Sequence, residues 1–172
     1  ELAYALRQIV HEHIEDKHLS TAYASASETA RTASGDCTEH AVLLAAGHAP
    51  GRYCTALAPL GIPSRVCHGL VYVEQGGSAI DGQVHVDASG NVDPAGGRLT
   101  GQYGWHMWTQ ALIAGKWIDL DATLHLPFTV GHVLVGTSSM ADKDAHNNHM
   151  QMAALIGNLE ITVHDVSHSF ER

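Results

Sequence analysis

Residues 34–46 read SGDCTEHAVLLAA, a stretch with the signals of a capped helix start followed by good helix formers. A Ser-Gly pair breaks the preceding pattern, and Asp36 is placed to cap a new helix whose third residue is Glu39, an acidic variant of the capping box. Alanine and aliphatic residues continue the helix until the Gly- and Pro-containing stretch 47–51 ends it. The segment therefore predicts a helix whose first residue is Cys37.

Two further helices are predicted before this segment. Apolar residues at helical spacing cover 2–17, and 20–33 is rich in alanine and contains neither Pro nor Gly. Five strands are predicted after it, because β-branched, aromatic and alternating residues recur between turn signals. They cover 65–73, 83–86, 106–113, 116–121 and 159–163. Helices first and an antiparallel sheet later predict an α+β domain, with the helices packed on the sheet.

Size and charge exclude several classes of protein. The chain has 172 residues, of which 45% are hydrophobic and 16% charged, so a single domain over 1–172 is expected. The formal charge of −9 argues against nucleic-acid binding, and no apolar run is long enough to predict a membrane segment. The chain begins at Glu1 without a leader, so we expect a fragment of a longer chain and leave its localisation open.

The 14 histidines raise the question of a metal. They are scattered rather than gathered at the spacing of zinc ligands, so we predict no metal site and no cofactor, with a zinc protein as the alternative. The three cysteines, Cys37, Cys54 and Cys67, form an odd set without a CxxC pair. They do not describe a disulfide framework, and at least one thiol is expected to be free.

Cys37 is the candidate nucleophile. At the first turn of a helix, unpaired backbone N–H groups and the helix dipole stabilise the thiolate form of a cysteine. The alternative is a small buried thiol without chemistry. Cys54 follows the Gly/Pro break and Cys67 lies within a strand, so both are predicted to be structural.

A base for Cys37 follows from the register of the hairpin. If Ala114-Gly115 is a two-residue turn, residues that face each other have numbers that sum to 229, and Asp121 lies diagonally across from His106. Diagonal neighbours are about 7 Å apart at the backbone, within reach of a hydrogen bond between the two side chains. Asp119 faces Gln110 and is too distant. The alternative is a surface contact that contributes little.

Four blocks of the sequence resemble the transglutaminase-like superfamily, most closely its bacterial members. They are GDCTEHAVLL at 35–44, GIPSRV at 61–66 followed by Gly69, GWHMW at 104–108 and WIDLDAT at 117–123. The resemblance extends over about 1–165 and includes the tail around His132. It implies a papain-like core in which Cys37, on a helix, faces His106 and Asp121 on the sheet. Between Ala46 and Gly61 the chain is longer than the family requires, and we expect a bulge or a second helical piece that leaves Cys37 in place.

The resemblance implies thiol-dependent acyl transfer or hydrolysis on the amide of a protein or peptide, through a thioester and with an amine as a possible acceptor. The residues do not decide between a transglutaminase, a deamidase and a cysteine protease or amidase, and a non-catalytic peptide-binding module is a further alternative. Trp105 and Trp108 flank the histidine and are predicted to line the substrate channel, with core packing as the alternative. His40 is expected to pack on the helix face.

Overall fold

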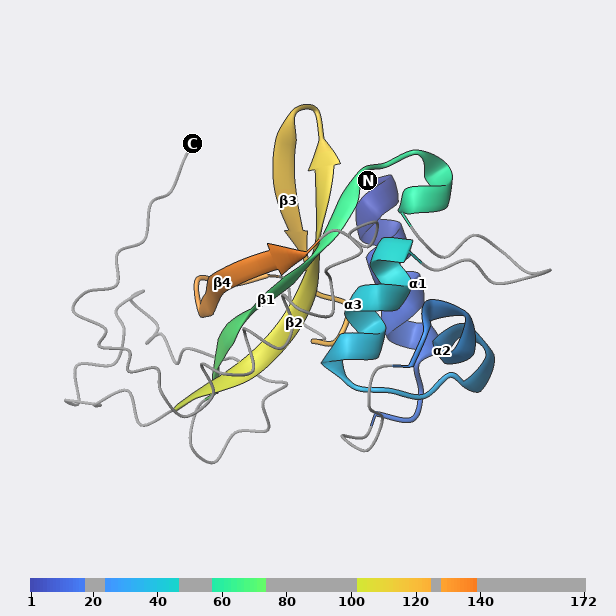
Figure 1. Ribbon diagram of the computed structural model, residues 1–172, viewed down its shortest axis with the longest axis horizontal. Helices are drawn as coiled ribbons and strands as arrows, with labels where there is room; N and C mark the ends of the chain where they lie inside the picture. Colours follow the sequence, from blue (N-terminus) through green and yellow to red (C-terminus); the bar gives the residue numbers. More distant parts are fainter. Residues whose placement is uncertain (18–23, 47–56, 74–101, 125–127, 139–172) are drawn as a thin grey trace, which may run out of the picture.

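The computed structural model describes residues 1–17, 24–46, 57–73, 102–124 and 128–138. In these residues the helices come first along the chain and the strands of the sheet follow. The helices are α1 (Leu2–His13), α2 (Ala26–Thr32), α3 (Cys37–Ala46) and the short 3-10 helix η1 (Ala58–Leu60). The strands are β1 (Ser64–Val73), β2 (Gln102–Ile113), β3 (Lys116–Leu120) and β4 (His132–Ser138). Helices α1 to α3 lie together on one side of the sheet (Figure 1). The predicted α+β class is confirmed.

Helix α3 has the predicted bounds, whereas α1 and the described part of the second predicted helix cover shorter ranges than expected; residues 20–23 of that prediction lie outside the described residues. Ile14 is extended, with φ −86° and ψ 92°, so α1 ends at His13 although the apolar pattern continues. Helix α2 begins only after Ser25, whose hydroxyl accepts from Glu28 N at 3.3 Å, and it ends at Ala33 in the left-handed region. Local capping therefore overrides the composition of the segment.

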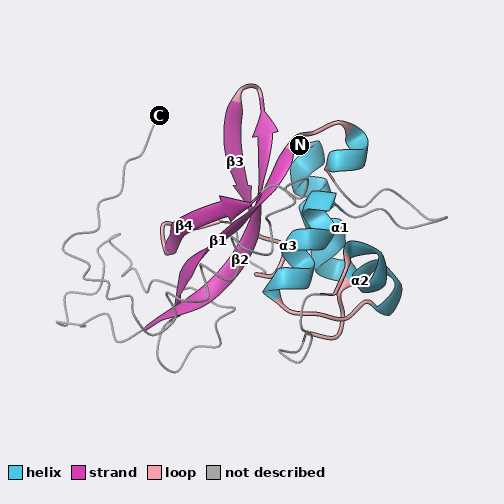
Figure 2. Cartoon of the chain, viewed as in Figure 1, coloured by secondary structure: helices cyan, strands magenta, loops and turns pink. Residues whose placement is uncertain are grey.

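The sheet has four antiparallel strands in the order β3-β2-β1-β4 (Figure 2). The predicted strand at 65–73 is confirmed, and the hairpin has the predicted register, with Ile113 opposite Lys116 and Gln110 opposite Asp119. Both turn residues, Ala114 and Gly115, have positive φ, as a two-residue hairpin turn requires. Strand β4 was not predicted. The predicted strands at 83–86 and 159–163, and the chain at 47–56, lie outside the described residues.

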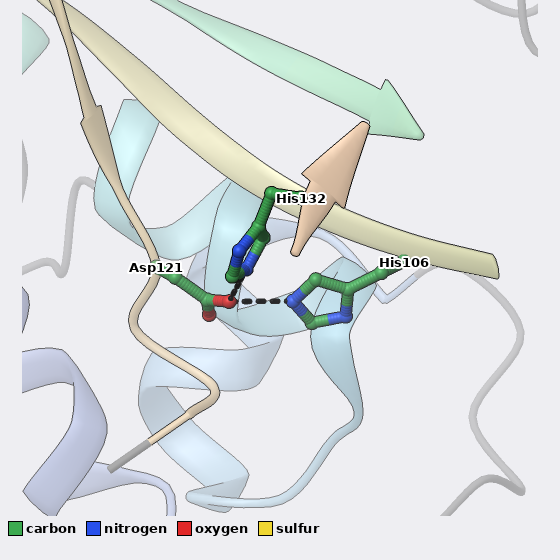
Figure 3. Close-up of side chains that lie close together, drawn as sticks. All are labelled: His106, Asp121 and His132. Carbon is green, nitrogen blue, oxygen red and sulfur yellow. Dashed lines mark hydrogen bonds and ion pairs between the residues drawn. The ribbon is translucent and has the colours of Figure 1, made fainter. Parts of the chain in front are cut away.

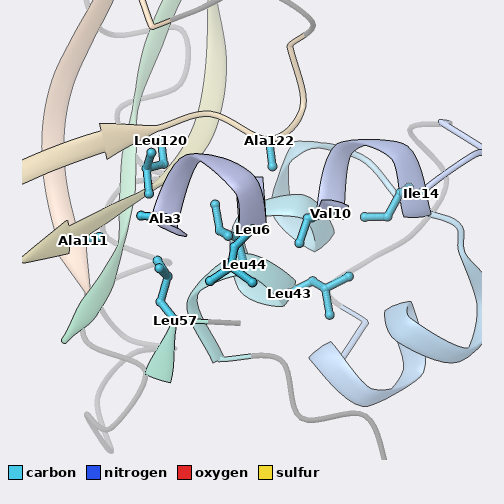
Figure 4. Packing of buried hydrophobic residues seen from close by; sticks show 10 residues of the cluster. All are labelled: Ala3, Leu6, Val10, Ile14, Leu43, Leu44, Leu57, Ala111, Leu120 and Ala122. Carbon is cyan, nitrogen blue, oxygen red and sulfur yellow. The ribbon is translucent and has the colours of Figure 1, made fainter. Parts of the chain in front are cut away.

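The main core joins the helices to the end of the hairpin. Its buried members come from α1 and the residue after it, from α3, from Leu57, and from β2, β3 and the segment that follows β3, as Figure 4 shows. They are Ala3, Leu6, Val10, Ile14, Leu43, Leu44, Leu57, Ala111, Leu120 and Ala122. Because Leu120 and Ala122 are both buried in this core, the core fixes the backbone on either side of Asp121, just after the end of β3.

A smaller cluster attaches α3 to β1 and β2. Ala41 and Ala45 of the helix pack on Val66 and Met107, and Cys37 lies against the same cluster. The alanines bring the helix backbone close enough for Thr109 Oγ1 to donate to Ala41 O at 2.9 Å. The first turn of α3 is thereby placed beside β2. Among the described helices, none has the length and apolar character needed to cross a membrane.

Candidate active site

The start of α3 is held by a reciprocal pair of hydrogen bonds. Thr38 N donates to Asp36 Oδ1 at 2.8 Å, and Asp36 N donates to Glu39 Oε2 at 3.0 Å, which confirms the predicted capping box. The other oxygen of Glu39, a fully buried residue, accepts from Ala24 N at 2.9 Å. Gly35, at φ +156°, allows this arrangement because a Cβ there would lie 2.4 Å from Glu39 Cβ. The backbone around Cys37 is therefore fixed from both sides.

Cys37 is half-buried and is the first residue of α3, as predicted. The next residue ties the helix to the strand that carries His106, because Thr38 Oγ1 donates to Met107 Sδ at 3.3 Å. The Cys37 side chain lies close enough to the imidazole of His106 to help raise its pKa. Segments 69 positions apart in sequence thus bring the sulfur and the ring together.

The predicted contact between His106 and Asp121 is present. His106 Nε2 lies 2.6 Å from Asp121 Oδ2, and both side chains are buried (Figure 3). Since the carboxylate accepts, Nε2 carries the proton and Nδ1 is the ring atom left for Cys37. Among the side chains that the sequence predicted to be catalytic, His106 therefore interacts with Asp121 by a hydrogen bond and with Cys37 electrostatically.

The electrostatics of this chain favour a charged imidazole. Burial alone would lower the pKa of His106, but hydrogen bonds and charge from Asp121 and Cys37 outweigh it and raise the pKa to about 10. For Asp121, burial would raise the pKa, but hydrogen bonds from His106 and His132 and the charge of His106 hold it well below its ordinary value. An ionised carboxylate beside an imidazolium is one arrangement that activates a cysteine nucleophile.

Helix α1 holds the segment that carries Asp121, a role that the sequence did not reveal. Arg7 Nε donates to Asp121 O at 2.5 Å, and its guanidinium also donates to Leu124 O. His11 Nδ1 lies 2.9 Å from Ala122 O. These contacts join residues more than 110 positions apart, so no local pattern could have indicated them.

His132 is the other site residue that sequence reasoning missed. Its Nε2 lies 3.0 Å from Asp121 Oδ2, the same oxygen that His106 contacts. The resemblance to a family drew attention to the tail around it, but the strand that carries it was not predicted. Its proximity to Asp121 depends on the pairing of β4 with β1, which is a tertiary feature.

The structure places the two predicted substrate residues differently. Trp105 is half-buried, whereas Trp108 is 1% exposed and donates from Nε1 to Asp119 Oδ1 at 2.9 Å. The Trp108 ring stacks on His106 at 6.2 Å between centroids and meets His132 edge-on at 5.4 Å. In this conformation Trp108 supports the two imidazoles, and a contact of either tryptophan with substrate stays a prediction.

The remaining candidates have structural surroundings. Cys67 is buried, and burial, with a smaller contribution from Asp119, raises the pKa of its thiol to about 12, so it is not a nucleophile at neutral pH. Cys54 lies outside the described residues. Arg65 donates from Nε to Gln110 Oε1 at 2.8 Å and lies 3.9 Å over the ring of Trp117. His40 is fully buried, with Nδ1 2.6 Å from Asp36 O.

His106, Asp121 and His132 form the one group among the described residues that offers three ligand atoms to a metal, all within 4.8 Å of one another. However, the two contacts to Asp121 Oδ2, at 2.6 and 3.0 Å, have the lengths of hydrogen bonds. Donor atoms around a tetrahedral zinc ion stand about 3.3 Å apart. The geometry therefore favours hydrogen bonds from the two histidines to Asp121 over a metal ion bound between the three side chains.

A solved structure resembles this chain only distantly. It is a protein from Cytophaga hutchinsonii that carries the provisional name of a cysteine protease, with 20% sequence identity and a TM-score of 0.49. The match covers 82% of this chain but only 37% of the other, so this chain spans well under half of that protein. A search of curated proteins found no match.

A family model matches the part of the chain that contains all three residues predicted to be catalytic. The model of the transglutaminase-like superfamily matches residues 1–122, which include Cys37, His106 and Asp121. This region includes the described α-helices α1 to α3, the strands β1 to β3 and the capped start of α3. The chain belongs to the transglutaminase-like superfamily.

Proposed function

We propose that this protein transfers the acyl group of a glutamine or peptide amide to an amine or to water. In this reaction Cys37 is the nucleophile, His106 is the general base and acid, and Asp121 orients the imidazole. The observation that carries the proposal is the buried 2.6 Å hydrogen bond from His106 Nε2 to Asp121 Oδ2, which leaves Nδ1 for Cys37. Family membership supports the thiol chemistry.

In the first step, His106 takes the thiol proton at Nδ1, and Sγ of Cys37 attacks the carbonyl carbon of the amide. The new C–S bond gives a tetrahedral intermediate. When it collapses, the C–N bond breaks, and the imidazolium returns its proton to the departing ammonia or amine. A thioester on Cys37 is left. Asp121 stabilises the imidazolium in this cycle, as its ionised state allows.

The oxyanion of the intermediate needs hydrogen-bond donors near Cys37. The first N–H groups of a helix point toward its N-terminus and have no partner within the helix. Thr38 N is already bonded to Asp36, whereas Cys37 N donates to no acceptor among the described residues. Cys37 N is therefore the donor that we assign to the oxyanion.

The thioester is resolved either by an amine or by water. An amine gives transamidation, and water gives deamidation of glutamine or cleavage of a peptide bond. The choice depends on which nucleophile reaches the thioester and not on the triad, because both reactions use the same base.

An assay with a glutamine peptide and a labelled primary amine tests the proposal. Amine incorporation, ammonia release and peptide fragments are measured together, with Cys37→Ala as the control. Incorporation identifies a transamidase, ammonia without incorporation a deamidase, and fragments a protease. Equal signals from the wild type and the Cys37→Ala variant, across a panel of amides, would contradict the proposal and favour a non-catalytic peptide-binding module.

A further inference from the structure

We infer that His132 is a positioning residue for Asp121, because it supplies a second imidazole N–H to the carboxylate oxygen that His106 uses. This inference rests on the proposed function, since it concerns the same site. His132 is the first residue of β4, which lies two strands away from β2 in the sheet. The residue is thus brought to Asp121 by the sheet and not by the hairpin.

The contact of His132 with Asp121 is enclosed and direct. Its side chain is 1% exposed, and its Nε2 is 3.0 Å from Asp121 Oδ2. In Figure 3 the rings of His132 and His106 converge on this oxygen from different directions. Because an ionised carboxylate only accepts hydrogen bonds, Nε2 of each ring carries a proton.

The carboxylate of Asp121 is saturated by these donors. Oδ1 accepts from Thr123 N at 2.8 Å and from Leu124 N at 3.2 Å, while Oδ2 accepts from the two imidazoles. An ionised carboxylate offers about four acceptor positions, so all of them are used. Rotation of the carboxylate would break contacts on both oxygens at once, which fixes Oδ2 opposite His106.

His132 is itself held by neighbours other than Asp121. Its Nδ1 lies 3.4 Å from the hydroxyl oxygen of Thr129, which is able to donate to it, and its ring stacks on Phe128 with centroids 4.1 Å apart. Trp108 meets the same ring edge-on at 5.4 Å. Because these contacts fix the imidazole independently, it is able to position the carboxylate.

A glycine in β1 makes this approach possible. Gly69 pairs with His106 on one side and with Leu134 of β4 on the other, at a register shift. A Cβ at Gly69 would lie 2.2 Å from Val133 O and 2.6 Å from the ring of Trp108. Only glycine therefore allows β4 and the ring of Trp108 to pack this closely against β1. This close packing brings His132, the first residue of β4, within reach of Asp121.

In the proposed cycle, His106 gains and loses a positive charge in every turnover, and Asp121 must keep its orientation throughout. A second donor on Oδ2 holds the carboxylate in place while His106 is neutral and its own hydrogen bond is weaker. Loss of His132 is therefore expected to reduce kcat and to leave KM nearly unchanged, because His132 contacts Asp121 and not the nucleophile.

Two substitutions separate the hydrogen bond from the packing of the ring. His132→Gln places an amide N–H where Nε2 lies, and His132→Phe keeps an aromatic ring without a donor. For each variant of the 172-residue chain we would measure kcat and KM with the glutamine peptide, the alkylation rate of Cys37 with iodoacetamide, thermal unfolding, and the proton resonance of His106 Nε2–H. His68, a buried histidine bonded to Ser138 Oγ at 3.0 Å, receives the same substitutions as the control.

His132→Phe is expected to lower kcat about tenfold, the effect of one hydrogen bond to a charged group, and to shift the His106 resonance. His132→Gln should restore most of both, and the His68 variants should change neither. If His132→Phe does not fold, His132→Asn replaces it, since its shorter amide does not reach Oδ2.

An unchanged kcat and resonance in folded His132→Phe would overturn the inference, and so would equal losses in the Gln and Phe variants. The proposed function is tested separately by the wild type. If Cys37 alkylates no faster than a model thiol and no amide is turned over, the proposed function fails. The His106 resonance then still decides whether His132 controls the hydrogen bond to Asp121.

Discussion

His106 and Asp121 are joined by a 2.6 Å hydrogen bond, although the backbone ladder between their strands ends at the pair Thr109 and Leu120. Beyond that pair, Asp121 is held by the helix α1 through Arg7 and by backbone donors on Oδ1. The contact that the proposed chemistry needs therefore lies beyond the last paired residues of β2 and β3. There, hydrogen bonds from α1 hold the backbone of Asp121 in place of the hydrogen bonds between the strands.

Substitution of Asp121 by Asn should disable the histidine while the fold persists. The amide removes the charge that helps to raise the pKa of His106 to about 10, and it permits the wrong ring tautomer. We expect turnover to fall by on the order of 10³-fold or more. Steady-state assays between pH 5 and 11 would measure this loss.

The sign of the pH effect follows from the raised pKa of His106. The ion pair stabilises the folded protein fully below the ordinary histidine range and is lost as the pH rises through about 10. In Asp121→Asn this loss should occur at lower pH. Asp119→Asn is the control, because Asp119 accepts from Trp108 and Gln110 instead. A His106 pKa that is the same in Asp121→Asn and the wild type would contradict the electrostatic account.

The two described cysteines should differ sharply in reactivity. Cys37 is half-buried beside His106, whereas the buried thiol of Cys67 has a pKa raised to about 12. Native protein treated with iodoacetamide at pH 7 should be modified at Cys37 and not at Cys67, as peptide mapping would measure. Denaturant should expose Cys67 to the reagent. Comparable labelling of both thiols in the native state would refute this difference.

His40 should make the protein sensitive to acid. Burial lowers its pKa to about 4, so between pH 6.5 and 4 the unfolded chain takes up a proton that the folded chain does not. The stability that neutral His40 contributes is present above about pH 6.5 and is lost as the pH falls, by up to about 1.4 kcal/mol per pH unit.

His40→Asn isolates this effect, because its amide can still donate to Asp36 O in place of Nδ1. The free energy of unfolding, measured with urea at several pH values, should fall more steeply below pH 6.5 in the wild type than in the variant. Parallel slopes for the two proteins would show that His40 is not the group responsible.

Gly69→Ala should disturb both the fold and the site. The new Cβ would meet Val133 O and the ring of Trp108, and backbone must move to accommodate it. Overpacking of this kind costs about 1–3 kcal/mol, and we expect a lower Tm together with reduced turnover. Gly131→Ala is the matched control, since its Cβ would meet nothing closer than 3.3 Å. Equal effects of the two substitutions would argue against a special role for Gly69.

The parts of the site that the sequence predicted are those that local rules govern. The capping box at Asp36 and Glu39 sets the first residue of α3, and a two-residue turn sets the register that brings Asp121 near His106. Both depend on neighbours in sequence, so local rules were enough to name Cys37 and His106 as candidates for the nucleophile and its base.

The parts that were missed depend on long-range packing. Strand β4 pairs with β1, more than 60 residues earlier, and its burial pattern does not alternate cleanly. His132 therefore gave no periodic signal. The contact of Arg7 with the backbone of Asp121 arises in the same way, from α1 packing beside the end of β3. Residues that support a carboxylate from another element leave no local pattern in the sequence.

The central claim is that Cys37 forms a thioester with an amide substrate. Intact-mass spectrometry of protein that is quenched in acid soon after it is mixed with a glutamine peptide tests this most directly. We predict an adduct equal to the mass of the peptide less ammonia, mapped to Cys37, absent in Cys37→Ala and removed by hydroxylamine. Turnover of the peptide without any adduct on Cys37, or with the adduct on another residue, would contradict the account.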